Sequence, residues 1–341
     1  MRREPGLTAP TIDALLAPLA DYDSALLAVS GGPDSTALLA LAVEWAHRAP
    51  QAPRIAAATV DHGLRSESAG EAAAVGALCA RLGVPHSVLS WQGDKPTSRI
   101  QERARTARYA LLGAHAREIG ARAIVTAHHL DDQAETALFR LLRGSGVGGL
   151  RAMAASADLD GLPLLRPLLG VAKRDLVACC EARDLDYARD PSNDDPHYAR
   201  TRMRKLAANL AEEGLDAAGL ARLARRAGQI EDALTHQTRC AAVRLGLAAG
   251  SSCDPAKLLA EPTEIVQRLL AEAIADIGGR PPHRIGLAKI EALTQHLARA
   301  YAAGAPFSAN VAGVRVRLAH GALRVAPEPP RRPLAQPRER G

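Results

Sequence analysis

Apolar residues recur along the first half of the chain in short runs, and amphipathic segments separate these runs. Each apolar run has the length of a buried strand, and the runs cover residues 25–29, 55–60, 86–89 and 123–126. The intervening segments carry apolar residues at helical spacing, over residues 34–47, 68–82, 100–118 and 131–142. Strands that alternate with helices indicate a parallel sheet with helices on both faces. We therefore predict an α/β fold with a Rossmann-like, doubly wound parallel sheet.

The pattern changes after residue 199, where Ala, Leu and Arg at helical spacing predict helices over 199–245, 261–277 and 284–303. Two alternating segments, 314–318 and 322–325, predict a hairpin that turns at His320 and Gly321. Between the two halves, the Gly-rich segment 144–149 predicts a flexible loop. We expect four parts: an N-terminal extension over 1–20, a catalytic domain over 21–210, a smaller and mainly helical domain over 215–328, and a disordered tail over 329–341.

The composition indicates which kind of partner the protein binds. The 341 residues carry a formal net charge of +6, and 43 residues are Lys or Arg. Only five of these are Lys, which leaves 38 Arg. Arginine suits phosphates and planar bases, although Arg and Ala also abound in chains with GC-rich coding sequences. The charge therefore makes a nucleic-acid partner plausible without establishing one.

Cysteine usage and hydropathy indicate the cellular compartment of the protein. The five cysteines form no Cys-x-x-Cys pair, so neither a zinc knuckle nor a redox dithiol is indicated. An odd number of scattered cysteines suits a reducing compartment. The N-terminus leads into no long apolar core, and charges interrupt the other apolar stretches before they reach membrane-spanning length. We predict a soluble, cytoplasmic protein without membrane contact.

A Gly-rich turn, Ser30-Gly31-Gly32-Pro33-Asp34-Ser35, joins the first predicted strand to the first predicted helix. Backbone N–H groups at such a helix start bind phosphate. The hydroxyls of Ser30 and Ser35 can donate to phosphate oxygens, and Asp34 can hold a Mg²⁺ ion that bridges them. A Gly-Lys-Ser/Thr ending is absent, which excludes a Walker-type loop. The alternative is a plain strand–turn–helix connection whose small residues serve packing.

This six-residue pattern resembles the signature of the PP-loop ATP pyrophosphatases, an adenine nucleotide α-hydrolase-like group that cleaves ATP between the α and β phosphates. The resemblance implies ATP and Mg²⁺ as cofactors, with the 30–35 loop around the phosphates. Val60 and His62 follow the second predicted strand and are expected to line the adenine pocket. Alone, His62 is more often a strand-end histidine with a structural hydrogen bond.

A second cluster of functional residue types lies where the fourth predicted strand leads into a helix. If that helix begins by His128, then His128, Asp132 and Glu135 share one helical face. Two carboxylates and an imidazole can bind an amine, accept its proton or hold a metal. The alternative is a solvated acidic first turn, which the helix dipole favours.

Six motifs in order resemble the tRNA(Ile)-lysidine synthase family over about residues 20 to 205. They are the 30–35 loop, Val60-Asp61-His62-Gly63-Leu64-Arg65, Gln101-Glu102-x-Ala104-Arg105-x-x-Arg108-Tyr109, the 128–136 segment, Arg140-Leu141-Leu142-Arg143-Gly144-Ser145-Gly146 and Asp190-Pro191-Ser192-Asn193-x-Asp195. Many members carry a second C-terminal domain, and this chain is expected to end after the first.

The resemblance implies an ATP-dependent ligation of free L-lysine to the wobble cytidine of a tRNA(Ile) with a CAU anticodon, which changes its codon from AUG to AUA. The cytidine 2-oxygen is first adenylated, and the lysine amine then displaces AMP. By the family pattern, Asp34 binds the metal and takes part in catalysis. The lysine site is formed by His128, Asp132, Glu135 and Arg108. Which group takes the amine's proton stays open. Expected tRNA phosphate contacts are Arg143, Arg200 and Arg204, with Arg202 less favoured. A homodimer is a further expectation.

Other readings compete with this one. A PP-loop tRNA thiolase of the related cytidine type uses Cys-x-x-Cys pairs, which are absent, and the synthetases of GMP or asparagine need a glutaminase domain. A metal-dependent phosphohydrolase on His128, His129, Asp131 and Asp132 would leave the 30–35 loop without a role. A non-catalytic RNA-binding protein would not need Asp34, Asp132 and Glu135.

Overall fold

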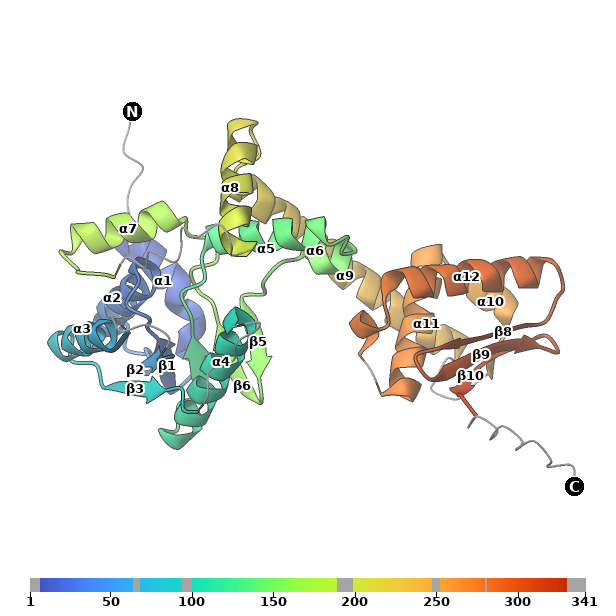
Figure 1. Ribbon diagram of the computed structural model, residues 1–341, viewed down its shortest axis with the longest axis horizontal. Coiled ribbons are helices and arrows are strands. Elements are labelled where there is room, and N and C mark those ends of the chain that lie inside the picture. The colour runs from blue at the N-terminus through green and yellow to red at the C-terminus, as the bar shows by residue number, and fades with distance from the viewer. Residues whose placement is uncertain are drawn as a thin grey trace, which may run out of the picture. The chain divides into compact units, whose positions relative to one another are not determined.

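The computed structural model describes residues 7–63, 68–93, 100–188, 199–246, 252–279 and 281–329 (Figure 1). The chain divides into two compact units, residues 1–227 and 228–341. Each unit has a hydrophobic core of its own.

The first unit is built on a six-stranded sheet with the order β3-β2-β1-β4-β6-β5. Every neighbouring pair in this sheet is parallel except β5 with β6, which confirms the predicted doubly wound parallel sheet. The strands are β1 (Ser24–Ala28), β2 (Arg54–Asp61), β3 (His86–Ser90), β4 (Ala123–Val125), β5 (Ser156–Leu159) and β6 (Leu162–Leu165). The β5–β6 hairpin was not predicted, because its strands are four residues long and Asp158 and Pro163 interrupt their apolar pattern.

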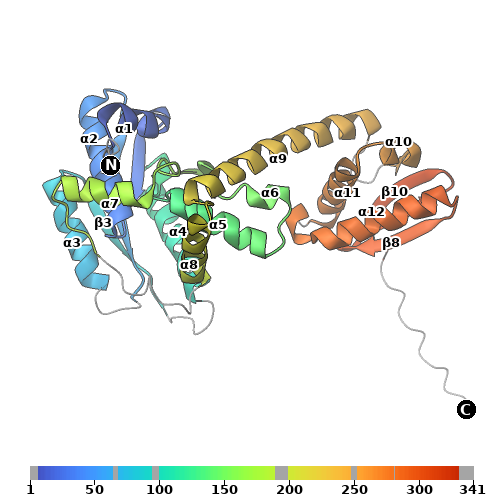
Figure 2. The same cartoon turned by 90° about the horizontal axis from the view of Figure 1, so that it is seen from above.

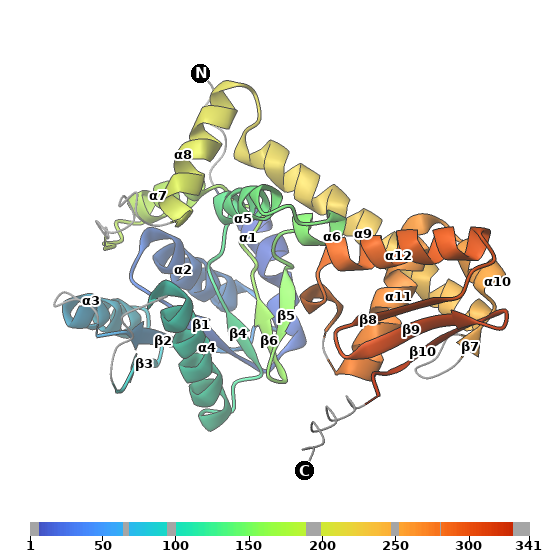
Figure 3. The same cartoon turned by 45° about the vertical axis from the view of Figure 1, so that its right-hand side comes forward.

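Helices cover both faces of this sheet, as the alternating pattern predicted (Figures 1 and 3). One face of β1 and β4 contributes Leu27 and Val125 to a core shared with α1, α2, α3 and α7. The other face contributes Leu26 and Ile124, which pack against Leu112 of α4. The helices concerned are α1 (Ala9–Leu16), which η1 (Ala17–Asp21) follows, α2 (Pro33–Arg48), α3 (Ser68–Arg81), α4 (Ile100–Glu118) and α7 (Lys173–Ala182).

A further layer of helices follows the carboxyl end of β4. It consists of α5 (Leu130–Leu142), α6 (Val147–Leu150), α8 (Ala199–Glu212) and α9 (Ala217–Leu245), which runs from the first unit into the second. Ala134 and Leu138 of α5 pack against Leu220 of α9 and against apolar residues of α8. The prediction of a loop over 144–149 was wrong in its second half. There, the segment forms the helical turn α6, and Arg140 donates hydrogen bonds to the carbonyls of Gly149 and Ala152.

The second unit combines helices with a four-stranded antiparallel sheet of order β7-β10-β9-β8. The predicted hairpin is confirmed as β9 (Val314–Ala319) and β10 (Ala322–Pro327). The strands β7 (Ser252–Cys253) and β8 (Phe307–Val311) were not predicted, so the unit is less purely helical than the sequence suggested. Figure 2 shows α12 beside the strands. The other elements are α10 (Pro255–Leu259), α11 (Thr263–Gly278), η3 (Pro282–Arg284) and α12 (Leu287–Ala302).

Some expectations fall on segments outside the described residues. They are the start of the N-terminal extension, the 190–195 motif and almost the whole predicted tail. Among the helices that the structure describes, none combines the length and the apolar character needed to cross a bilayer.

The core of the first unit gives a stability prediction. Leu38 of α2 is fully buried in this core, so Leu38→Ala removes apolar contacts and leaves a cavity. We expect the free energy of unfolding of this unit to fall by about 2–5 kcal/mol. Urea titration followed by tryptophan fluorescence measures it, because both tryptophans, Trp45 and Trp91, belong to this unit. Leu142→Ala is the control: Leu142 is 63% exposed, and the change should stay within about 0.5 kcal/mol.

Candidate functional site

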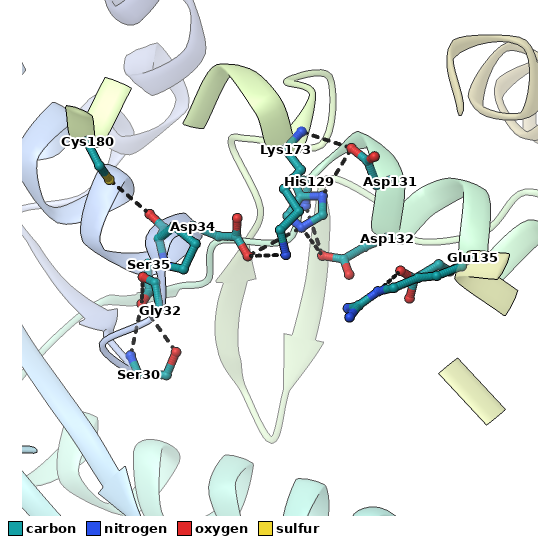
Figure 4. Close-up of polar contacts among 12 residues, drawn as sticks. Ser30, Gly32, Asp34, Ser35, His129, Asp131, Asp132, Glu135, Lys173 and Cys180 are labelled. Carbon is teal, nitrogen blue, oxygen red and sulfur yellow. Dashed lines mark hydrogen bonds and ion pairs between the residues drawn. The ribbon is translucent and has the colours of Figure 1, made fainter. Parts of the chain in front are cut away.

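The 30–35 loop connects β1 to α2 and is held open by its own hydrogen bonds (Figure 4). The hydroxyl of Ser35 accepts the backbone N–H of Ser30 at 3.1 Å and donates to the carbonyl of Gly32 at 3.1 Å. Gly31 has a φ of +85°, a conformation that other residues rarely adopt. Gly32 is the N-cap of α2, and Pro33 occupies its first turn, where a missing N–H costs little. The 30–35 loop thus forms the predicted turn into the N-terminus of α2, and phosphate binding there stays a prediction.

Two contacts from later in the chain fix this loop. The backbone N–H of Ala188 donates to the carbonyl of Gly31 at 2.8 Å. The thiol of Cys180 on α7 donates to the carbonyl of Pro33 at 3.3 Å. Burial raises the pKa of Cys180 to about 12, so the thiol keeps the proton that this bond needs. Cys180 thus serves as a buried structural donor.

The start of α5 differs from the expectation in one respect. The helix begins at Leu130 with His129 as its N-cap, and the carboxylate of Asp132 accepts the backbone N–H of His129 at 3.1 Å. His128 therefore precedes the helix, and the prediction that it shares a helical face with Asp132 and Glu135 was wrong. The backbone leaves β4 in an extended conformation, and His128 Nδ1 instead lies 2.9 Å from the hydroxyl of Thr126.

His129 links the 30–35 loop to the acidic start of α5 (Figure 4). Its ring is buried, with the side chain 3% exposed. Its Nε2 lies 3.4 Å from Asp34 and 3.6 Å from Asp132, and its Nδ1 lies 3.6 Å from Asp131. Burial lowers the pKa of His129, but the contacts with Asp131 and Asp34 outweigh this effect and raise the pKa to about 9. His129 is therefore an imidazolium at neutral pH.

Lys173 brings a second cation to the same carboxylates. It begins α7, and its Nζ lies 3.7 Å from Asp34. Its backbone N–H donates to Asp131 at 2.9 Å. The contact with His129 and this bond help to keep the pKa of Asp131 below its usual range. The sequence analysis considered His129 only in the phosphohydrolase alternative and did not single out Lys173, because no local pattern shows that either residue reaches Asp34.

Glu135 lies one helical turn beyond Asp132 and is also buried. Its Oε1 accepts a hydrogen bond from Nε of Arg204 on α8 at 2.7 Å. Burial lowers the pKa of Arg204, but the bond to Glu135 outweighs it and raises the pKa. The structure thus places Arg204, expected on tRNA phosphate, at a carboxylate of the site.

The remaining predicted residues lie around this centre. Arg108 is exposed on α4, and Arg143 is exposed just after α5 with its guanidinium 4.1 Å from the ring centre of Phe139. Val60 is half-buried near the end of β2, and the ring of His62 contacts Trp91 edge-on at 5.9 Å. The Arg200 side chain is outside the described residues. Their roles stay predictions.

The residues present fit a magnesium ion held mainly by a nucleotide. Asp34 Oδ1 is buried and takes part in no hydrogen bond with any described residue. Mg²⁺ is commonly bound by one or two carboxylates together with substrate phosphates and water. No group of three or more His, Cys, Asp or Glu in the described part of the chain could hold a metal by itself.

A Gly-rich strand–helix turn on a doubly wound parallel sheet is the architecture of the PP-loop proteins, and the family model described as a PP-loop domain matches residues 8–210. A tRNA(Ile)-lysidine synthase of Methylobacterium sp. (strain 4-46) is 48% identical over 313 residues, which cover 90% of each chain. A tRNA(Ile)-lysidine synthase of Bradyrhizobium sp. (strain BTAi1) is 44% identical over an alignment of 345 positions that covers 96% of each chain. The chain belongs to the tRNA(Ile)-lysidine synthase family, which confirms the resemblance inferred from its motifs.

The solved structures extend the likeness in fold. A U34-tRNA thiolase from Methanococcus maripaludis superposes with a TM-score of 0.54 at 18% identity. The match covers 64% of this chain and 78% of the thiolase. At this identity the likeness concerns the fold alone.

Gly31 gives a prediction for the loop. A Cβ at this position would lie 3.2 Å from Val75 Cγ2 and would be strained by the positive φ. We expect Gly31→Ala to destabilise the first unit by about 1–2 kcal/mol and to weaken ATP binding, as measured by urea titration and calorimetry. Gly70→Ala in α3 is the control, because a Cβ there meets open space. Equal ATP affinity in the two variants would contradict this assignment of the loop.

The titration of His129 predicts how the stability of the protein depends on pH. Its folded-state pKa of about 9 exceeds the ordinary histidine value of 6.5, so its stabilising effect is full below pH 6.5 and disappears as the pH rises towards 9. In the presence of a chelator, the free energy of unfolding should fall by roughly 1–3 kcal/mol over that range. His129→Gln should lack this loss, whereas the exposed-site variant His47→Gln should retain it. Identical pH profiles for His129→Gln and the wild type would refute the interpretation.

Proposed function

We propose that this chain performs the reaction for which its family is named, the ATP-dependent ligation of free L-lysine to C2 of the wobble cytidine in the CAU anticodon of tRNA(Ile). One observation supports it above the others: His129 contacts both Asp34 in the phosphate-binding loop and Asp132 in the acidic cluster. In this proposal the 30–35 loop takes the activating nucleotide and the acidic cluster takes the amine, and the contacts of His129 lie between them (Figure 4).

The first step adenylates the cytidine. The cytidine O2 attacks the α-phosphorus of ATP, an O–P bond forms, and the bond to pyrophosphate breaks. The 30–35 loop offers backbone N–H groups at the N-terminus of α2, together with the exposed hydroxyl of Ser30, to the phosphate oxygens. Lys173, which already lies near Asp34, is a further cation within reach of these oxygens. A Mg²⁺ ion held by Asp34 would neutralise charge on the phosphates.

The second step transfers lysine. The ε-nitrogen of lysine attacks C2, the C2–O bond breaks, AMP leaves, and the amine gives up its protons. Asp132 and Glu135 supply negative charge for the incoming ammonium group, and Glu135 already binds a cation, the guanidinium of Arg204. His128, which follows the end of β4, is proposed as a further residue of the lysine site. Arg108 is proposed for the lysine carboxylate, and Arg143, Arg200 and Arg204 are proposed for tRNA phosphates.

The deciding experiment supplies the protein with ATP, Mg²⁺, L-lysine and a tRNA(Ile) transcript carrying the CAU anticodon. The products are separated, and the nucleosides are analysed by mass spectrometry. We expect a lysine-sized mass gain on one cytidine, with AMP and pyrophosphate in equal amounts. Inorganic phosphate as the sole product would instead indicate a phosphohydrolase, sulfur in the tRNA a thiolase, and unchanged tRNA with bound protein a non-catalytic RNA-binding role.

The acidic cluster gives a variant prediction. Glu135→Gln keeps the size of the side chain but removes the charge that attracts an ammonium group. We expect lysine transfer to slow by roughly 10²-fold or more, with a raised KM for lysine, because a charge-assisted contact is lost. Glu118→Gln on α4 is the matched control, since Glu118 is 76% exposed. A Glu135→Gln enzyme with wild-type lysine kinetics would contradict this role.

Two further properties belong to the proposal. A homodimer and a cytoplasmic location are both compatible with a tRNA-modifying enzyme of this kind. Sedimentation of the purified protein and fractionation of cells test them separately.

A further inference from the structure

Arg166 directly follows β6 and is a buried cation, with 8% of the residue exposed. Its backbone N–H donates to the carbonyl of Ala155 and its Nη1 to the carbonyl of Ala154, both at 2.8 Å. Its Nε is buried as well and takes part in no hydrogen bond with any described residue. No carboxylate in the described part of the chain neutralises this guanidinium. A buried charge without a counter-charge is costly, so this position favours an anionic ligand.

Two side chains of α4, Arg105 and Tyr109, lie close to this guanidinium. Burial lowers the pKa of Arg166, Tyr109 opposes this shift and Arg105 adds to it, so both groups are near enough to act on Arg166. The Arg105 guanidinium lies 5.1 Å from the centre of the Tyr109 ring. Among the described residues, no carboxylate pairs with Arg105 either. Two neighbouring cations of this kind repel each other, and an anion bound between them would remove the repulsion.

The pair lies at the edge of the sheet that carries the site. Leu164 packs in the core under α4, and Leu165 packs in the core on the opposite face. Because successive side chains of a strand alternate, Arg166 returns to the face covered by α4. On the neighbouring strand end, the backbone N–H of Thr126 donates to the carbonyl of Leu165 at 2.9 Å, and the Thr126 hydroxyl lies 2.9 Å from Nδ1 of His128. Arg166 is thus one strand further along this edge than His128.

The strand order sets the proposed parts of the site in a row. β2 ends near Val60, β1 leads into the 30–35 loop, β4 leads to His128 and the carboxylates of α5, and β6 leads to Arg166. Neighbouring strands lie about 4.8 Å apart. The four-carbon stem of a lysine molecule is long enough to extend from one strand end to the next. The end of β6 is therefore suited to the far end of a lysine whose amine lies at α5.

We propose that Arg166 and Arg105 bind the α-carboxylate of the substrate lysine while the carboxylates of α5 hold its ammonium group. This inference rests on the proposed function and extends the carboxylate site from Arg108, three residues after Arg105 on α4, to two further residues. A guanidinium binds a planar carboxylate through two parallel N–H groups. Arg166 is buried, so it is accessible to a small ligand, whereas an RNA backbone reaches exposed arginines such as Arg143.

The choice of ligand gives a first test, in which the full-length protein is unchanged. L-Lysinamide keeps the stem and the amines of lysine but carries a neutral amide in place of the carboxylate. We expect calorimetry to give a Kd for L-lysinamide roughly tenfold or more above that for L-lysine, because charge-assisted hydrogen bonds are lost. Equal Kd values for the two ligands would overturn the proposal.

Two variants assign this preference to the two guanidinium groups. Arg166→Gln and Arg105→Gln should each raise the Kd for L-lysine roughly tenfold and leave the Kd for L-lysinamide within about twofold. Arg103→Gln on the same helix is the matched control, because Arg103 is exposed, and it should bind both ligands as the wild type does. If Arg166→Gln fails to fold, the half-buried Arg105 still provides the test.

The outcomes separate this site from the proposed function. Variants that bind L-lysine as the wild type does, or that lose affinity for both ligands equally, would overturn the carboxylate site even if lysidine is formed. A loss of tRNA affinity with unchanged lysine binding would assign the two arginines to RNA phosphate and would also overturn it. The expected Kd pattern in a protein that makes no lysidine would support the carboxylate site and refute the proposed function.

Discussion

The contact of one buried imidazolium with three carboxylates determines the shape of this site. His129 contacts Asp34, Asp131 and Asp132, and its single positive charge reduces the mutual repulsion of these three carboxylates. The ring is inside the protein, where charge–charge interactions are much stronger than in water. His129 and Lys173 therefore together connect the 30–35 loop, the start of α5 and the start of α7.

The sheet explains why residues so distant in sequence meet there. β1 and β4 are parallel neighbours, so their carboxyl ends lie at the same edge, and each continues into a functional segment. The loop after β1 supplies Asp34, and the segment after β4 supplies His128 and His129. β6 pairs with β4 on its other side and brings the carbonyl of Leu165 to the same edge. Strand order thus brings three separate segments into one site.

The sequence alone was enough to predict the elements with strong apolar periodicity and to locate the motifs at strand ends. The core strands, α2 to α5 and the β9–β10 hairpin are where apolar periodicity predicted them, within one or two residues. Two kinds of feature could not be predicted from the sequence. The β5–β6 hairpin has strands too short to show a period, and its pairing depends on β4. The contacts of His129, Lys173 and Arg204 depend on tertiary packing between helices that are separate in sequence.

Gly31 lies close to α3, since a Cβ at this position would stand 3.2 Å from Val75 Cγ2. Val75, Leu78 and Cys79 of α3 are buried in the core of the first unit. A larger side chain at residue 75 would displace the turn without changing any residue of the loop. The conformation of the 30–35 turn and the packing of α3 are therefore linked, so a substitution in this part of the core also changes the turn.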